Sequence, residues 1–251
     1  MTSAIYPSLK DRTVIVTGGA SGIGEAIVRA FAGQGARVGF LDMDKPAAEK
    51  LVADLPQDRV AFEYCDLRDI DALRKAIAAI RDKFGPINIL VNNAARDDRH
   101  DMDTVTSDYW DERIATNLKH QFFAAQAVAP DMRAGGGGAI VNMGSVSWIV
   151  GQGGMPCYTT AKSGVAGLTR SLARDLGPHN IRVNAVVPGW IMTQRQIDLW
   201  LNEESEKELM TRQCLKRKLY PEDIAKAVLF FASDEASGCT NQSYIVDGGW
   251  V

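Results

Sequence analysis

Short apolar runs alternate along the chain with longer stretches of helical periodicity. Seven runs have the continuous apolar character of strands buried on both faces of a parallel sheet: Thr13–Thr17, Arg37–Leu41, Val60–Cys65, Ile87–Val91, Ala139–Met143, Ile181–Val187 and Tyr244–Val246. Between them, amphipathic stretches such as Ala26–Gln34, Ile70–Phe84 and Ser163–Leu176 predict helices. This alternation predicts an α/β fold, a doubly wound parallel sheet of seven strands flanked by helices.

Two segments depart from the alternation. Residues 96–107 are polar and charged, and residues 190–219 are helical in parts and rich in Trp, Met, Glu and Lys. The run Gly135–Gly138 resembles an interdomain linker, but a strand pattern follows it at once, which favours a tight helix-to-strand turn. We therefore predict one domain over residues 1–251, in which the N-terminal part binds a nucleotide.

Composition narrows the class of protein. The chain has 251 residues, is 46% hydrophobic and carries a formal charge of −3, without the basic character of a nucleic-acid-binding domain. The sequence contains no apolar run of about 18 residues, so we expect no membrane span, and its start lacks the pattern of a secretory signal. The four cysteines are scattered without metal-ligand spacing. We expect reduced thiols, no metal and a cytoplasmic protein.

A glycine-rich turn follows the first predicted strand. Gly18, Gly22 and Gly24 lie between that strand and a helical pattern, in the sequence TGGASGIG. Glycine permits positive φ and a close approach of the backbone, and a helix N-terminus offers free N–H groups to a diphosphate. Asp42 ends the second strand run about 20 residues later, where a carboxylate can accept both hydroxyls of an adenosine ribose and repel a 2′-phosphate. The alternative for Asp42 is a cap on the next helix.

The spacing T-G-x-x-x-G-x-G resembles the short-chain dehydrogenase/reductase family, whose fold is of the Rossmann type. Further resemblances are Asn92–Ala95 (NNAA, where the family has NNAG), Pro188–Gly189 followed by Thr193, and the C-terminal VDGGW. The resemblance implies a nicotinamide cofactor held by Gly18, Ser21, Gly22, Ile23, Gly24, Asp42, Asp66, Leu67, Asn93, Ala94, Tyr158, Lys162, Pro188, Gly189, Ile191 and Thr193.

The expected cofactor is NAD. In this family, NADP-dependent members often carry a basic residue at the positions of Ser21 and Met43, and neither is basic here. Lys45 lies close enough in the sequence to leave NADP tolerance open.

A second group of residues matches the catalytic tetrad of the family: Asn117, Ser145, Tyr158 and Lys162. Removing an alcohol proton calls for a base, and lowering a tyrosine pKa from about 10 by roughly 3 units takes about 4 kcal/mol. We expect the Lys162 ammonium to supply part of this, so that Tyr158 is the general base. Ser145 would bind the reacting oxygen, and by resemblance Asn117 would hold a water in the proton path. Cys157, beside the base, is interpreted as a packing residue rather than a reactive thiol.

The substrate is expected between the two irregular segments. Arg96–His100 reads RDDRH, a set of donors and acceptors that suits a polyhydroxylated molecule at the carboxyl edge of the sheet. NNAARDDRH, GSVSW and the C-terminal residues resemble the bacterial aldose 1-dehydrogenases of the family. That resemblance implies oxidation of a sugar such as D-xylose, L-arabinose or D-galactose at C1 to a lactone. The candidate substrate residues are Arg96, Asp98, His100, Ser145, Ser147, Trp148 and Trp190, although either tryptophan is also consistent with a core position.

Two other functions remain open from the sequence. One is another short-chain enzyme, such as a 3-oxoacyl-carrier-protein reductase, and the other is a nucleotide-sensing regulator without turnover. Asp42 argues against the first and the intact tetrad against the second. By resemblance we expect a homotetramer that uses the predicted helices around Asn117–Met132 and Tyr158–Leu176 as one interface.

Overall fold

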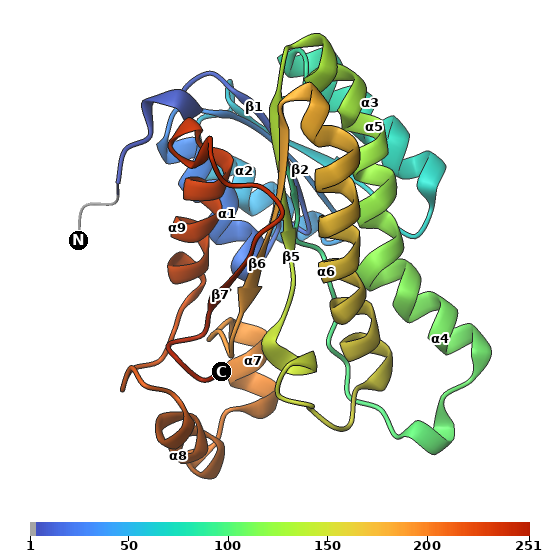
Figure 1. Ribbon diagram of the computed structural model, residues 1–251, viewed down its shortest axis with the longest axis vertical. Coiled ribbons are helices and arrows are strands. Elements are labelled where there is room, and N and C mark those ends of the chain that lie inside the picture. Colours follow the sequence, from blue (N-terminus) through green and yellow to red (C-terminus); the bar gives the residue numbers. More distant parts are fainter. Residues whose placement is uncertain (1–3) are drawn as a thin grey trace.

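A seven-stranded parallel sheet forms the centre of the computed structural model, which describes residues 4–251 (Figure 1). The strand order is β3-β2-β1-β4-β5-β6-β7. The strands are β1 (Thr13–Thr17), β2 (Arg37–Asp42), β3 (Val60–Tyr64), β4 (Ile89–Asn92), β5 (Gly138–Met143), β6 (Ile181–Pro188) and β7 (Ser243–Val246). All seven predicted strands are present, and the doubly wound α/β fold is confirmed.

Helices cover both faces of this sheet, as Figure 1 shows. One core cluster joins the sheet to α1 (Gly22–Gly33), α2 (Lys45–Ala53) and α9 (Pro221–Ala232). The opposite cluster joins it to α3 (Ile70–Phe84), α5 (His120–Ala134) and α6 (Pro156–Leu176). Consecutive strand residues face opposite layers: Val14 and Val16 enter the first cluster and Ile15 the second. Burial on both faces explains why the central strands read as continuous apolar runs, whereas most residues of the edge strand β7 are exposed.

The element ends differ modestly from the sequence prediction. Strand ends lie within two residues of the predicted ones, and α3 has the predicted bounds, because Asp69 caps its start and Gly85 follows its end. Helix α6 begins at Pro156, well before the predicted Ser163. Its first two turns carry Tyr158 and Lys162, which face the cleft described below, so they lack the core-facing apolar pattern.

The two irregular segments contain short helices. The first holds a 3₁₀ turn at Met102–Thr104 and leads into α4 (Ser107–Ile114), and the second holds α7 (Gln194–Trp200) and α8 (Glu203–Arg212). Residues 135–137 form the tight turn expected between α5 and β5. Among residues 4–251, no helix combines the length and apolar character needed to cross a membrane.

The strand order creates a switch point between β1 and β4. The chain runs outward from β1 through β2 to β3, then returns to place β4 on the other side of β1. The connections that leave β1 and β4 therefore diverge, which opens a crevice at their carboxyl ends. In Figure 1, α7 and α8 lie beyond this edge of the sheet.

Candidate active site

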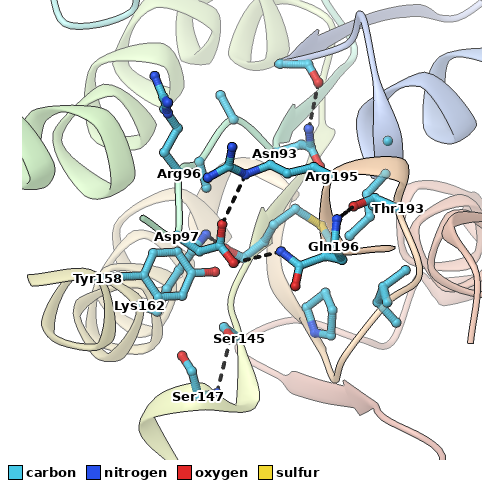
Figure 2. A pocket seen from close by; sticks show the side chains of 18 of the residues that line it. Asn93, Arg96, Asp97, Ser145, Ser147, Tyr158, Lys162, Thr193, Arg195 and Gln196 are labelled. Atoms are coloured by element: carbon cyan, nitrogen blue, oxygen red, sulfur yellow. Dashed lines mark hydrogen bonds and ion pairs between the residues drawn. The ribbon is translucent and has the colours of Figure 1, made fainter. Parts of the chain in front are cut away.

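A cleft of about 1090 Å³ occupies the carboxyl edge of the sheet. Every residue predicted to bind the cofactor lines it, from Gly18 after β1 to Thr193 before α7. The predicted Ser145, Tyr158 and Lys162 line it as well, and Figure 2 shows them together. Within residues 4–251, no three His, Cys, Asp or Glu side chains gather as they would around a metal ion.

The glycine-rich turn leaves room that only glycine permits. Gly18 has a φ of 66°, and a Cβ on Gly24 would lie 1.8 Å from the carbonyl oxygen of Gly18. Ser21 stands at the N-cap of α1 but makes no side-chain capping bond, so the first N–H groups of the helix remain available. A close backbone and uncapped N–H groups fit the diphosphate of a dinucleotide.

Asn93 fixes the turn to the end of β4. Its Nδ2 donates to the carbonyl oxygens of Thr17 at 3.0 Å and Gly18 at 2.9 Å. The hydroxyl of Thr17 in turn accepts from the backbone N–H groups of Asn93 at 3.0 Å and Ala94 at 3.2 Å. The two connections that leave β1 and β4 are therefore held together by backbone groups and two short side chains.

Asp42 is held at the cleft by three backbone groups. Its Oδ2 accepts from Ala20 N at 2.9 Å, and its Oδ1 accepts from Met43 N at 2.8 Å and Asp44 N at 3.0 Å. The helix cap that sequence reasoning considered for Asp42 is instead Asp44, which accepts from Ala47 N at the start of α2.

Lys45, whose proximity left NADP tolerance open, points elsewhere. Its Nζ lies 5.2 Å from the centroid of the Tyr64 ring, and the residue does not line the cleft. Of the lining residues between Gly18 and Asp66 in the described chain, none is Lys or Arg. Beyond them, Arg68 lines the cleft, but its guanidinium is held by Asp66 at 2.6 Å and Glu112 at 3.0 Å. The hydrogen bond from Arg68 lowers the pKa of Asp66.

Tyr158 and Lys162 lie one helical turn apart on α6, as the spacing predicted. Lys162 is 2% exposed, its Nζ donates to Met143 O at 2.7 Å, and it lies 5.6 Å from the centroid of the Tyr158 ring. Burial lowers the pKa of Lys162 to about 8.

Burial, together with the negative charge of Asp97, raises the pKa of Tyr158 to about 12. The hydrogen bond with Ser145 and the charge of Arg99 oppose this only in part. The expectation of a lowered Tyr158 pKa is therefore wrong for the protein alone. The loss of hydration on burial raises the pKa of Tyr158 by more than the hydrogen bond with Ser145 and the charge of Arg99 lower it.

Ser145 and Ser147 lie in the turn after β5. The hydroxyl of Ser145 accepts from Ser147 N at 3.2 Å (Figure 2), which begins a short 3₁₀ turn. The hydroxyl of Ser147 is buried in the lining of the cleft without a hydrogen-bond partner among the described residues. A buried, unpaired hydroxyl beside Ser145 is suited to a polar ligand.

Asn117 does not line the cleft. It is fully buried in the π-helical turn Ala115–Lys119, and its side chain is used inside the protein. Its Oδ1 accepts from Arg96 N at 2.8 Å and its Nδ2 donates to Arg113 O at 2.9 Å. The side chain of Asn117 therefore fixes the start of residues 96–100, which are called the charged segment below.

The charged segment divides between the cleft and the layer behind it. Of the candidate substrate residues, Arg96, Ser145, Ser147 and Trp190 line the cleft, whereas Asp98, His100 and Trp148 do not. Asp98 forms ion pairs with Arg113 and Arg195, both at 2.6 Å. The prediction that the substrate is contacted directly by Asp98, His100 and Trp148 is therefore corrected, because these residues do not line the cleft.

His100 supports the start of α6 from behind. Its Nε2 accepts from Cys157 N at 3.3 Å, which requires the proton on Nδ1, 3.0 Å from the carbonyl oxygen of Asp98. Cys157 itself is fully buried, and burial raises the pKa of its thiol, in agreement with a packing role. Trp148 borders a smaller cavity with Val187 and Ile245, which shares Gly144 and Lys162 with the lining of the cleft.

Comparison with known proteins agrees with this geometry. A family model described as Enoyl-(Acyl carrier protein) reductase matches residues 18–251. The D-xylose 1-dehydrogenase of Caulobacter vibrioides is 48% identical over 100% of both chains. The probable galactose dehydrogenase of Rhizobium meliloti is 49% identical over 99% of this chain and 98% of the relative.

A putative short-chain alcohol dehydrogenase from Sinorhizobium meliloti has a solved structure that superposes with a TM-score of 0.92. It is 33% identical and covers 97% of this chain and 98% of its own. The chain belongs to the short-chain dehydrogenase/reductase family. It is accordingly a dehydrogenase that uses a nicotinamide cofactor.

In this short-chain dehydrogenase, sequence reasoning missed several residues that line the cleft. They are Asp97, Arg99, Gln152, Arg195, Gln196 and Trp200. The helix that carries three of them is signalled by Thr193, whose hydroxyl accepts from Gln196 N and caps α7. Because Thr193 caps α7, Gln196 lies one helical turn later on the same side of the helix as Thr193. Its place in the lining could therefore have been predicted from the sequence.

Proposed function

We propose that the protein oxidises a cyclic aldose at C1 to the aldonolactone and uses NAD as the cofactor. The observation that carries this proposal is a set of polar side chains that line the same cleft as Tyr158: Asp97, Gln152, Gln196 and Ser147, whose buried hydroxyl is unpaired among the described residues. Such a lining suits the hydroxyls of a sugar and opposes an apolar chain. The relatives named D-xylose 1-dehydrogenase and galactose dehydrogenase support the same substrate class.

The proposed chemistry places Tyr158 as general base. The sugar would donate its C1 hydroxyl proton to the phenolate oxygen while Ser145 hydrogen-bonds the same sugar oxygen. Oxidised nicotinamide, when bound, supplies the acceptor for the hydride that leaves C1. With a pKa of about 8, Lys162 is mostly an ammonium at neutral pH, and this charge favours the phenolate. Asn117 would keep the adjoining segment in place through Arg96 N.

NAD is proposed over NADP because of the groups around Asp42. Its carboxylate is fixed by Ala20 N, Met43 N and Asp44 N, on a part of the cleft lined by no Lys or Arg among the described residues. A 2′-phosphate there would meet negative charge without compensation. Gly18, Gly22 and Gly24 would hold the diphosphate, and Asp66 with Leu67 would contact the adenine.

The test is a panel of aldoses, polyols and 3-hydroxyacyl thioesters with NAD, in which NADH formation is followed and the product is identified by mass spectrometry. We expect aldoses to be oxidised to lactones and thioesters to be poor substrates. A carrier-protein reductase would instead turn over the thioesters and leave the aldoses unreacted. This alternative is included because a 3-oxoacyl-[acyl-carrier-protein] reductase of Thermotoga maritima is 37% identical over 97% of this chain. A nucleotide sensor would bind NAD without any turnover.

We also propose that the enzyme is a cytoplasmic homotetramer. Phe122 on α5 is 41% exposed, which supports an interface that covers α5 and α6. Among the described residues, all four cysteines are free thiols, as expected in a reducing compartment. Light scattering of the purified protein tests the assembly, and a monomer would exclude it.

A further inference from the structure

Asp97 is the acidic side chain nearest to the proposed chemistry. It lines the cleft, and Figure 2 shows its carboxylate beside Tyr158. Its charge acts on both members of the Tyr–Lys pair, since it raises the pKa of Tyr158 and opposes the lowering of the pKa of Lys162. The neighbouring Asp98 lies outside the lining.

The carboxylate is oriented from one side. Its Oδ2 accepts from Gln196 Nε2 at 2.8 Å, and Gln196 Oε1 in turn accepts from Trp190 Nε1 at 2.9 Å, which fixes the amide. Arg99 adds a distant ion pair to the same Oδ2 at 3.6 Å. This arrangement holds Asp97 in place without relying on a ligand.

The other carboxylate oxygen keeps most of its accepting capacity. Its contact in the described structure is Arg195 Nε at 3.5 Å, the limit of a hydrogen bond. A carboxylate oxygen accepts two hydrogen bonds, and the side chain is 20% exposed. Oδ1 is therefore a positioned acceptor that is open to a donor from a molecule in the cleft.

We propose that Asp97 determines substrate specificity by accepting a hydrogen bond from the C2 hydroxyl of the aldose. This inference rests on the proposed oxidation at C1. The two neighbours of C1 in a cyclic aldose are the ring oxygen, which has no proton to donate, and C2, which carries a hydroxyl. Of these two neighbours, only the C2 hydroxyl can donate a hydrogen bond to a carboxylate beside the base that binds the C1 oxygen.

The experiment compares an aldose with its 2-deoxy form in the wild-type enzyme and two matched variants, Asp97→Ala and Asp98→Ala. Each variant removes a carboxylate that pairs with Arg195, but only Asp97 lines the cleft. The measured quantity is the ratio of kcat/KM for the aldose to kcat/KM for the 2-deoxy-aldose. Comparing this ratio between proteins cancels the intrinsic reactivity of the two sugars.

We expect Asp97→Ala to reduce the ratio by about 10- to 150-fold, the range of a hydrogen bond to a charged group. Asp98→Ala should leave the ratio within about threefold of wild type, as for an exchange with no direct contact. In Asp97→Ala, the acidic limb of the pH–rate profile should move to lower pH, because a charge that raises the pKa of Tyr158 is gone.

A ratio that stays the same in Asp97→Ala while aldoses still turn over overturns the proposal. So does an equal loss in Asp98→Ala. If Asp97→Ala does not fold, Asp97→Asn, which keeps the shape and removes the charge, takes its place, and the same ratio should still fall relative to wild type. Failure of the proposed function looks different, since wild type would then oxidise no aldose.

Discussion

The cofactor end of the cleft is built from backbone and short side chains, whereas the substrate end is built from long charged ones. At the first end, Asn93 and Thr17 tie two strand ends together through backbone groups, and Gly24 leaves the space. At the second end, Asp97 and Arg195 connect segments that lie 98 residues apart in the sequence. Both ends meet at Tyr158.

We infer from this difference that cofactor binding and substrate choice depend on different kinds of contact. Backbone contacts at strand ends depend on the fold, so side-chain changes elsewhere leave them in place. The ion pairs of the substrate end depend on a few side chains from two irregular segments. Changing one of them alters the hydrogen-bonding pattern without altering the sheet, and so the two ends should respond separately to mutation.

The largest effect is expected where the two ends meet. Tyr158→Phe keeps the ring but removes the ionising oxygen, so the rate should fall on the order of 10²–10⁴-fold, while the Kd for NAD should change far less. Steady-state kinetics and a cofactor titration measure the two quantities. Tyr109→Phe is the matched control, since Tyr109 does not line the cleft. Near-native turnover in Tyr158→Phe would exclude Tyr158 as the base.

A smaller effect is expected at the cofactor end. Wild type should favour NAD over NADP in kcat/KM by at least about tenfold, which corresponds to about 1.4 kcal/mol, and Asp42→Ala should narrow this preference. Asp44→Ser preserves a capping oxygen for α2 but removes a second negative charge from the lining, so it should narrow the preference less than Asp42→Ala does. Equal use of both cofactors by wild type would contradict the assignment of Asp42.

The smallest effect on catalysis is expected behind the substrate end. His100→Ala removes the acceptor for Cys157 N and should lower the free energy of unfolding by about 1–2 kcal/mol. Because His100 does not line the cleft, the ranking of aldoses by kcat/KM should stay the same. Chemical denaturation and the aldose panel measure these two properties. If the ranking of aldoses by kcat/KM changed while the free energy of unfolding stayed the same, His100 would instead have to contact the substrate.

The same comparison explains what the sequence could predict. The proposed cofactor end depends on local signals, a strand followed by a glycine-rich turn and a helix, so the sequence could name candidate residues that line one cleft in the structure. The seven strands followed from the alternation of apolar runs and helical patterns, whereas their order in the sheet is given by the structure. Helix α6 began earlier than expected because its first turns face a cleft and not the core.

The substrate end was harder to predict because its signals are not local. The sequence prediction named Asp98 as a substrate residue, whereas the structure places the neighbouring Asp97 in the lining of the cleft. Trp148 and Trp190 were equally plausible as sugar-facing residues until the fold placed Trp190, and not Trp148, in the lining. The π-helical turn at Asn117 has no recognisable sequence pattern.

The most direct test of the central claim follows the hydride itself. An aldose that carries deuterium at C1 is incubated with the enzyme and NAD, and the products are separated and analysed by mass spectrometry and NMR. The account predicts deuterium on the nicotinamide ring of NADH and an aldonolactone that has lost the label. Unlabelled NADH, or a product that retains deuterium at C1, would contradict oxidation of an aldose at that carbon.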